Sequence, residues 1–334
     1  MAKKLSIIIP AHNAQACIEK TIQTVLAQKC QSQMEIIVVD DASQDKTKEL
    51  VRKFPVELIE LSQNQGAGKA RNQGAKKATG EILVFLDADV YLEPEALAII
   101  EQFFGKNPSA SGLVGNYTQL PADKNFCSVY HNLFTVYHHQ LSETEIKWFW
   151  GAIGAIRKEV FEEVGGFPEN FPGASAEDIE LGFRITKAGY KIFYLPELKG
   201  VHAHYFSLSS MLSNDWRKAV LGLKVYFQRK SRGERTHGFF HPLNGINIFL
   251  IYLQWLSLLG FGFFWQPSFL ILLALFFIIN YHFYQYISKQ AGGLYLIGSL
   301  ILHWLAFNAI VGGVIAGFIG LILGKDLESK TRWI

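Results

Sequence analysis

Two carboxylates one residue apart carry the clearest chemical signal in this sequence. Asp87 and Asp89 flank Ala88 directly after the apolar run Glu81–Leu86. In an extended segment, residues two apart lie on the same face, so both carboxylates can approach one cation. Mg²⁺ and Mn²⁺ accept mixtures of carboxylate and phosphate oxygens, and such an ion would let the acidic pair tolerate an anionic diphosphate. An ordinary acidic loop is the alternative that this short pattern leaves open.

Two further segments carry residue types that suit a nucleotide. Asp41 follows the apolar run Glu35–Val39, and Asn64–Asn72 contains a glycine-bearing turn that leads into a helix. Backbone N–H groups at the start of that helix, together with Lys69 or Arg71, would face phosphate. A simple tight turn with a solvated helix face is the competing interpretation.

The elements that must position these residues alternate between strand-like and helical patterns. The strand-like runs are Leu5–Ile9, Glu35–Val39, Val56–Leu61 and Glu81–Leu86. The helical segments between them are Ala14–Gln28, Asp45–Phe54 and Ala67–Ala78. This alternation predicts βαβ units, and therefore an α/β fold with a mostly parallel central sheet flanked by helices. Ligands of such sheets bind beyond the carboxyl ends of the strands, where Asn13, Asp41 and Asp87–Asp89 lie.

The regular alternation loosens after residue 90. Helical patterns cover Glu95–Phe104, Phe126–Leu141, Ala176–Ala188 and Ser207–Arg229. Extended patterns cover Leu113–Leu120, Trp148–Ile156, Tyr190–Leu195 and Lys199–His204. We expect these elements to complete one catalytic domain over residues 1–230.

The last third of the chain is far more apolar than the rest. The sequence is 49% hydrophobic and 18% charged overall, and charged residues nearly vanish after Ile246. Three apolar segments, 246–264, 268–287 and 294–323, are long enough to cross a hydrocarbon core of ~30 Å. They predict a C-terminal transmembrane helical region over 246–323, followed by a short polar tail at 324–334. A buried core helix is the alternative for any single segment.

Charge placement predicts the side of the membrane. The expected linker 231–245 is basic and follows Arg229 and Lys230, which favours a cytoplasmic catalytic domain. Three cysteines without a CxxC spacing favour buried reduced thiols, as suits a cytosolic domain. The basic tail favours an even number of spans whereas three segments are odd, so the parity stays open. A net charge of only +3 argues against a nucleic-acid partner.

Five short segments together resemble the family 2 glycosyltransferases with the GT-A fold. They are Ile9–Asn13, Val39–Ser43, Gly68–Asn72, Asp87–Asp89 and Glu177–Asp178. The resemblance covers about the first 225 residues. No single segment is decisive, but their order and spacing together are highly specific.

The resemblance implies a role for particular residues of this chain. The donor nucleotide site would contain Pro10, Ala11, Asn13, Asp41, Gly68, Arg71, Asp87 and Ala88. The metal would lie at Asp87, Asp89 and His202, with His204 as the alternate histidine. Asp178 would be the catalytic base, and the acceptor and sugar pocket would contain Trp150, Gly151 and Glu177.

The implied activity is metal-dependent, inverting transfer of one hexose from a UDP- or GDP-linked sugar. The apolar segments suggest a membrane lipid or lipid-linked glycan as acceptor, and an integral protein of the bacterial inner membrane. A processive polysaccharide synthase is one alternative. The Gln-x-x-Arg-Trp motif of such enzymes is missing here, because Trp216 precedes Arg217 and no glutamine stands at the required place. A catalytically idle nucleotide-sugar-binding membrane protein is the other alternative.

Overall fold

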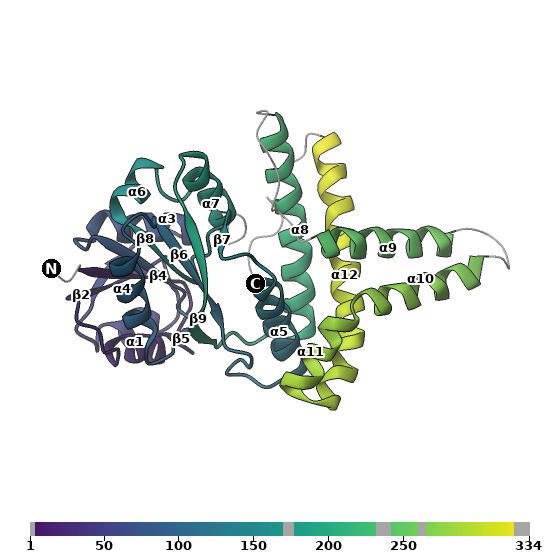
Figure 1. Ribbon diagram of the computed structural model, residues 1–334, viewed down its shortest axis with the longest axis horizontal. Helices are drawn as coiled ribbons and strands as arrows, with labels where there is room; N and C mark the ends of the chain where they lie inside the picture. The colour runs from purple at the N-terminus through teal and green to yellow at the C-terminus, as the bar shows by residue number, and fades with distance from the viewer. Residues whose placement is uncertain (1–3, 170–176, 232–241, 260–264, 324–334) are drawn as a thin grey trace. The chain divides into compact units, whose positions relative to one another are not determined.

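The computed structural model of the chain describes residues 4–169, 177–231, 242–259 and 265–323 (Figure 1). The chain divides into two compact units. The first unit contains Met1–Ala122 and His139–His204, and the second contains Asp123–His138 and Tyr205–Ile334. Most of the predicted linker 231–245 and the whole predicted tail 324–334 lie outside the described residues.

The first four strands form the parallel half of a nine-stranded sheet. They lie in the order β3-β2-β1-β4, with β1 at Leu5–Ala11, β2 at Met34–Asp40, β3 at Glu57–Glu60 and β4 at Ile82–Leu86. The connecting helices are α1 at Ile18–Leu26, α2 at Thr47–Val51 and α3 at Ala67–Lys77. The predicted βαβ units are therefore present, and the carboxyl ends of these strands share one edge of the sheet.

Beyond β4 the sheet is mixed, so the expectation of a mostly parallel sheet holds only for its first half. The remaining strands are β5 at Val90–Leu92, β6 at Gly112–Tyr117, β7 at Glu145–Ile146, β8 at Ile153–Arg157 and β9 at Ile192–His202. β8 runs antiparallel to both β4 and β6, whereas β9 is parallel to β6 and antiparallel to β5 and β7. Antiparallel neighbours need no helical crossover, so the alternating pattern disappears from this part of the sequence.

Three extended patterns in this half were bounded differently from the strands that form. The pattern Trp148–Ile156 becomes a strand only from Ile153, and the Gly151 N–H donates to the Asp178 carboxylate instead of to a strand. The patterns Tyr190–Leu195 and Lys199–His204 join into the single strand β9. The interrupted strand start leaves Trp150 and Gly151 in a loop.

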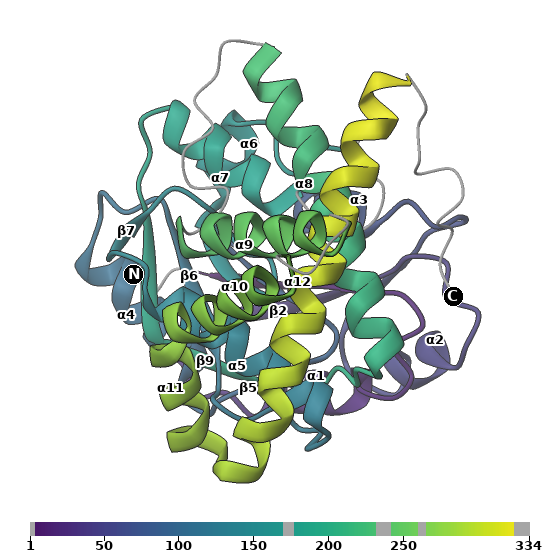
Figure 2. The ribbon, with the colours of Figure 1, turned by 90° about the vertical axis from the view of Figure 1, so that its right-hand side faces the viewer.

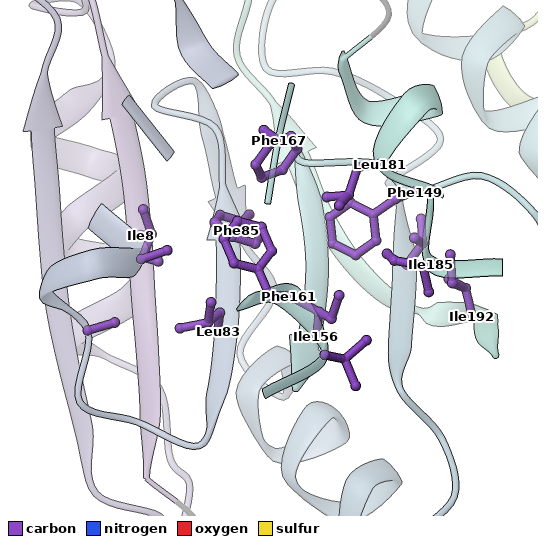
Figure 3. Close-up of a cluster of buried hydrophobic side chains, with 14 of the residues drawn as sticks. Ile8, Leu83, Phe85, Phe149, Ile156, Phe161, Phe167, Leu181, Ile185 and Ile192 are labelled. Carbon is purple, nitrogen blue, oxygen red and sulfur yellow. The ribbon is translucent and has the colours of Figure 1, made fainter. Parts of the chain in front are cut away.

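Side chains from strands and helices fill one core around Phe85. The flanking helices of this unit include α4 at Ala96–Lys106, α6 at Lys158–Glu163 and α7 at Glu177–Lys187. Phe85 meets Phe149 and Phe167 edge to face, with ring centroids 6.1 and 5.0 Å apart, and Phe161 at 5.3 Å (Figure 3). Such aromatic pairs add to the burial of apolar area. Because Asp87 follows two residues later, this packing determines where the acidic turn leaves the sheet.

The second unit is helical. It contains α8 at Leu208–Ser231, α9 at Pro242–Leu259, α10 at Trp265–Ile279, α11 at Tyr281–Ala291 and α12 at Gly293–Ile322. It also contains most of α5, which runs from Phe126 to Gln140. α8 and α12 approach each other closely at Gly313 of α12, which has no side chain. A Cβ there would lie 2.4 Å from the Trp216 backbone oxygen on α8. α9 and α10 lie side by side in both views of the ribbon (Figures 1 and 2).

The second unit has an apolar interior, but it also buries amide side chains and leaves many aliphatic side chains exposed. Asn247 and Asn280 are buried and exchange two amide hydrogen bonds of 2.8 and 3.0 Å. Trp255 donates to Asn308 at 2.7 Å between α9 and α12. Large exposed side chains on α9, α10 and α12 are mostly aliphatic, namely Ile246, Leu256, Leu258, Leu270, Ile271, Leu275, Ile278, Leu294, Ile297, Ile301, Ile319, Leu321 and Ile322. Interhelical amide bonds inside an apolar exterior are typical of helices packed in lipid.

Within the described residues, α12 is the one helix that is long and apolar enough to cross a membrane by itself. Residues 267–279 and 281–291 pass the same test only together, and they are bent by 56° at Asn280. The apolar helix at Leu243–Leu258 is shorter. One C-terminal helix therefore fits the predicted transmembrane region, whereas the three spans 246–264, 268–287 and 294–323 stay a prediction.

The partly buried carboxylate of Glu35 connects the amino-terminal ends of the parallel strands and leads to a stability prediction. Glu35 accepts hydrogen bonds from the Ser6 hydroxyl at 2.5 Å and the Thr79 N–H at 2.6 Å, and pairs with Lys4 at 3.1 Å. Burial alone would raise the pKa of Glu35, but these hydrogen bonds outweigh it and lower the pKa to about 2. Because the folded value lies below the ordinary 4.5, the carboxylate stabilises the fold above pH 4.5.

We expect Glu35→Gln to lower the free energy of unfolding by about 1–2 kcal/mol at pH 7, allowing for solvent screening. The difference from wild type should shrink by more than half by about pH 3, as the wild-type carboxylate nears its folded pKa. Urea denaturation of the detergent-solubilised protein, followed by tryptophan fluorescence, measures both effects. Glu60→Gln is the matched control, because its pair with Arg52 is exposed and should contribute under about 0.5 kcal/mol. Equal losses in the two variants would contradict the prediction.

Candidate active site

Acidic side chains gather at the carboxyl-end edge of the parallel strands. Asp87, Ala88 and Asp89 form the turn between β4 and β5. In this turn the Val90 N–H donates to the backbone carbonyl oxygen of Asp87 at 3.1 Å. The Asp87 N–H donates to the Ala152 carbonyl at 3.2 Å, which ties this turn to the loop before β8. The edge of the sheet therefore holds both carboxylates where open α/β sheets bind ligands.

Arg71 lies at the centre of this acidic group. Its guanidinium is buried and pairs with Asp87 at 2.7 Å, Glu177 at 3.2 Å and Asp178 at 3.5 Å. The guanidinium carbon also lies 5.2 Å from the centroid of the Phe167 ring, within range of a cation–π contact. Arg71 thus joins the turn after β4 to the first turn of α7.

The start of α3 and the turn after α6 are held by side chains from neighbouring segments. Both carboxylate oxygens of Asp41 accept backbone N–H bonds of 2.7 Å, from Gln65 and Gly66. Gly66 has φ +88, a conformation that glycine adopts without strain. Asn72 accepts from the Phe167 N–H at 3.0 Å and donates to the Phe167 carbonyl at 2.9 Å. These bonds set the position of α3, and hence that of Arg71.

Asp178 combines burial with a fixed orientation. The Gly151 N–H donates to its Oδ2 at 2.9 Å, while Oδ1 faces Arg71. Burial raises the pKa of Asp178 to about 7; the positive charge of Arg71 lowers it, and the negative charge of Glu177 raises it further. A carboxylate with such a pKa can accept a proton near neutral pH.

Two histidines flank Asp89. His204 Nδ1 lies 3.2 Å from Asp89 Oδ2, whereas His202 Nε2 lies 3.9 Å from the same oxygen. His202 is buried and stacks on Tyr117 with ring centroids 4.3 Å apart, but His204 is exposed. The structure thus brings both candidate histidines to Asp89, and the alternate, His204, is the closer of the two.

The charge balance of the cluster suits a bound cation, although no complete metal cage exists. No group of three or more His, Cys, Asp or Glu side chains among the described residues is arranged to hold a metal ion. Asp87 is engaged by Arg71, which leaves Asp89 and a histidine. Asp87, Glu177 and Asp178 nevertheless pair with one guanidinium, that of Arg71, and Asp89 lies beside the two histidines. A divalent ion completed by donor oxygens would reduce the negative charge of this group.

The residues assigned to the nucleoside serve largely as scaffold in the structure. Asn13 has φ +50, accepts from the Gln44 N–H and donates its own N–H to the Ser43 hydroxyl. Pro10 and Ala11 end β1, and each carboxylate oxygen of Asp41 accepts one of the two backbone N–H bonds described above. Direct contact of these side chains with a nucleoside stays a prediction.

Three other predicted residues have packing partners inside the protein. A Cβ on Gly68 would lie 3.4 Å from the Pro168 carbonyl oxygen. The Ala88 carbonyl accepts from the Thr21 hydroxyl at 2.6 Å. Trp150 packs against Tyr117 and His139, with ring centroids 4.6 Å apart in each pair. Trp150 is partly buried, so its predicted contact with sugar stays a prediction.

Tyr117 is a residue of this site that the sequence analysis missed. Its buried ring lies between His202 and Trp150. Burial and then the charges of Asp89, Asp87 and Asp178 raise the pKa of Tyr117 far above 10, so its phenol is neutral. Tyr117 ends β6, whereas the predicted strand ran on to Leu120, so the sequence pattern did not place Tyr117 at a strand end.

Comparison with known proteins agrees with this architecture. Residues 6–165 match the family model described as glycosyl transferase family 2, and residues 133–209 match one described as the N-terminal domain of galactosyltransferase. Residues 6–165 therefore carry a family 2 glycosyltransferase domain, which supports a transferase enzyme. The resemblance drawn from its motifs is thereby confirmed.

Curated relatives and solved structures extend the comparison. The probable glycosyltransferase YdaM of Bacillus subtilis is 30% identical over 211 residues, which cover 58% of this chain and 49% of that protein. Validoxylamine A glucosyltransferase of Streptomyces hygroscopicus subsp. limoneus is 28% identical over 248 residues, with 63% and 55% covered. The chain thus spans about half the length of these relatives.

The mannosyltransferase PcManGT from Pyrobaculum calidifontis was solved in complex with GDP-Man and Mn²⁺. It superimposes with a TM-score of 0.60 at 20% identity, covering 98% of this chain and 89% of that chain. At this identity the likeness concerns the fold alone, and the mixed α/β sheet with its flanking helices is the predicted GT-A fold.

The elevated pKa of Asp178 predicts the pH dependence of turnover. Because only the ionised carboxylate accepts a proton, kcat/KM should rise with pH through a midpoint near 7. We expect Asp178→Asn to lower kcat by about 10²–10⁴-fold and to abolish this limb. Initial rates from pH 5.5 to 9 measure both, with Glu162→Gln as an exposed control that keeps the wild-type profile. An unchanged limb in Asp178→Asn would assign the titration to another group.

Proposed function

We propose that this chain is a metal-dependent inverting glycosyltransferase that moves one sugar from a nucleotide-diphospho-sugar to a membrane lipid or lipid-linked glycan. The observation that carries the proposal is the carboxylate of Asp178. It is held by Gly151 and Arg71, has a pKa near 7, and shares Arg71 with the Asp87 carboxylate beside Asp89. A proton acceptor and an acidic donor site are thereby joined in one cluster.

The proposed reaction is a single displacement at the anomeric carbon. The acceptor oxygen forms a bond to that carbon while the bond from the carbon to the diphosphate oxygen breaks. The nucleoside diphosphate leaves with the bonding electron pair, and Asp178 takes the acceptor's proton. If the acceptor is a phosphate that is already ionised, Asp178 serves only to orient it.

A divalent ion, Mg²⁺ or Mn²⁺, would be held by Asp89 together with His204 or His202. When bound, it would neutralise negative charge on the donor diphosphate. Two observations support this: the acidic excess of the cluster, and the Mn²⁺ and GDP-Man named for PcManGT, a protein of the same fold. A UDP- or GDP-linked sugar is the donor class that we propose.

A membrane location is supported by the exposed aliphatic side chains and the buried amide pairs of the second unit. Buried amides such as Asn247 and Asn280 bond to each other, while aliphatic side chains cover the outside of α9, α10 and α12. In water this distribution would expose much apolar area. In lipid the aliphatic side chains would face hydrocarbon, and the buried amides would keep their hydrogen bonds. We propose that this unit lies in the membrane and that the catalytic unit works at its cytoplasmic face.

Metal dependence and donor use can be tested together on the purified full chain. With a panel of UDP- and GDP-sugars, we expect Mn²⁺-dependent transfer that falls at least about 100-fold in excess chelator and returns when the ion is restored. Asp89→Ala should weaken Mn²⁺-dependent nucleotide binding, measured by calorimetry. Turnover unaffected by chelator would contradict the metal role. Nucleotide binding without transfer to any lipid extract would favour an idle binding protein, and a ladder of long products would favour a processive synthase.

Membrane insertion predicts a position-dependent effect of charge on α12. Ile301 is 60% exposed, and a lysine there would face hydrocarbon at a cost of about 2–3 kcal/mol. We expect Ile301→Lys to reduce the fraction that stays in the membrane pellet after alkaline carbonate extraction. Ile301→Ala is the control and should remain in the pellet like wild type. Complete extraction of the wild-type protein would contradict the membrane proposal.

A further inference from the structure

We infer that Arg71 is a positioning residue for Asp178 and that it does not bind the donor phosphate. This inference rests on the proposed function, in which Asp178 is the base. It reverses the expectation from the sequence, which placed Arg71 on the phosphate because of its position beside a glycine-bearing turn. The contacts of the guanidinium carry the inference.

The guanidinium is already committed to carboxylates from two distant segments. Nη2 pairs with Asp87 after β4, whereas Nη1 faces Glu177 and Asp178 at the start of α7. The side chains of Arg71 and Glu177 are each only 3% exposed. To reach a phosphate, the guanidinium would have to leave the buried carboxylate of Glu177 and the partly buried carboxylates of Asp87 and Asp178, and breaking a buried pair is strongly unfavourable.

The space around the guanidinium also restricts its movement. A Cβ on Gly151 would lie 2.8 Å from both Cζ and Nε of Arg71, so the guanidinium lies directly against the backbone there. Phe167 contacts the guanidinium from another side, and Asn72 holds the Phe167 backbone through two hydrogen bonds. Asn72, which follows Arg71 on α3, therefore holds the Phe167 ring in place against the Arg71 guanidinium.

This placement gives Arg71 two effects on Asp178. It directs one carboxylate oxygen of Asp178, while the Gly151 N–H directs the other. Its positive charge also favours the ionised form against burial and against the neighbouring Glu177. Arg71 thus acts on the reaction through Asp178, and its effect should vanish when Asp178 can no longer accept a proton.

A double-mutant cycle on the whole chain of 334 residues in detergent tests this dependence. The variants are Arg71→Lys, Arg71→Met, Asp178→Asn and the two double variants. Arg184→Met is the matched control, because Arg184 lies on α7 and pairs with Glu180 at 3.5 Å. Calorimetry with UDP and with GDP, each with Mn²⁺, measures nucleotide binding, and transfer assays with the best donor give kcat and KM.

We expect the Arg71 variants to bind nucleotide within about 3-fold of wild type while kcat falls at least about 100-fold, as for loss of a general base. In the Asp178→Asn background the same substitutions should change kcat by no more than about 3-fold. Arg71→Lys should retain more activity than Arg71→Met, because it keeps the charge but not the forked geometry. Arg184→Met should match wild type in every assay.

Two results would overturn the inference. Nucleotide binding weakened more than about 10-fold by Arg71→Lys, with kcat preserved, would make Arg71 a phosphate ligand. Fully additive losses in the cycle would show that Arg71 acts independently of Asp178. If circular dichroism shows that Arg71→Met does not fold, the same two criteria are applied to Arg71→Lys alone. A wild-type chain that transfers no sugar contradicts the proposed function instead, and the binding comparison then still decides whether Arg71 holds phosphate.

Discussion

A buried guanidinium shared by three carboxylates is the interaction on which the candidate site depends. Arg71 brings Asp87, at the end of β4, together with Glu177 and Asp178, at the start of α7. Without this positive charge the carboxylates would repel one another in a poorly solvated space. The same contact therefore links β4 to α7, orients the proposed base and joins the proposed donor side of the site to the proposed acceptor side.

The scaffold around this contact explains how such an arrangement can be held. Phe85 packs against Phe149, Phe161 and Phe167, which come from the loop before β8, from α6 and from the turn after it. Asn72 adds hydrogen bonds to the Phe167 backbone. The apolar core thus lies directly beneath the charged cluster, so the segments that supply the carboxylates cannot move independently. Rigid support of this kind is what a proton-transfer geometry requires.

The two units both have apolar cores, but they differ in where their polar side chains lie. The first unit buries aliphatic and aromatic side chains around its sheet and concentrates charge at one edge. The second unit buries amides within its apolar core and also leaves aliphatic side chains outside. Each distribution suits a different solvent, which is the physical basis for proposing an enzyme that works on an acceptor held in the membrane.

The sequence by itself determined the local features of this protein: the parallel strands, the acidic pair Asp87 and Asp89 at a strand end, and the apolar α12. These depend on residue periodicity and on neighbours a few positions apart, which a sequence displays directly. Only the tertiary structure decided that Arg71 faces carboxylates, that His204 is nearer to Asp89 than His202, and that Tyr117 belongs to the site. Arg71 and Asp178 are 107 positions apart, and such a pairing follows from how the mixed half of the sheet folds back, which no local pattern records.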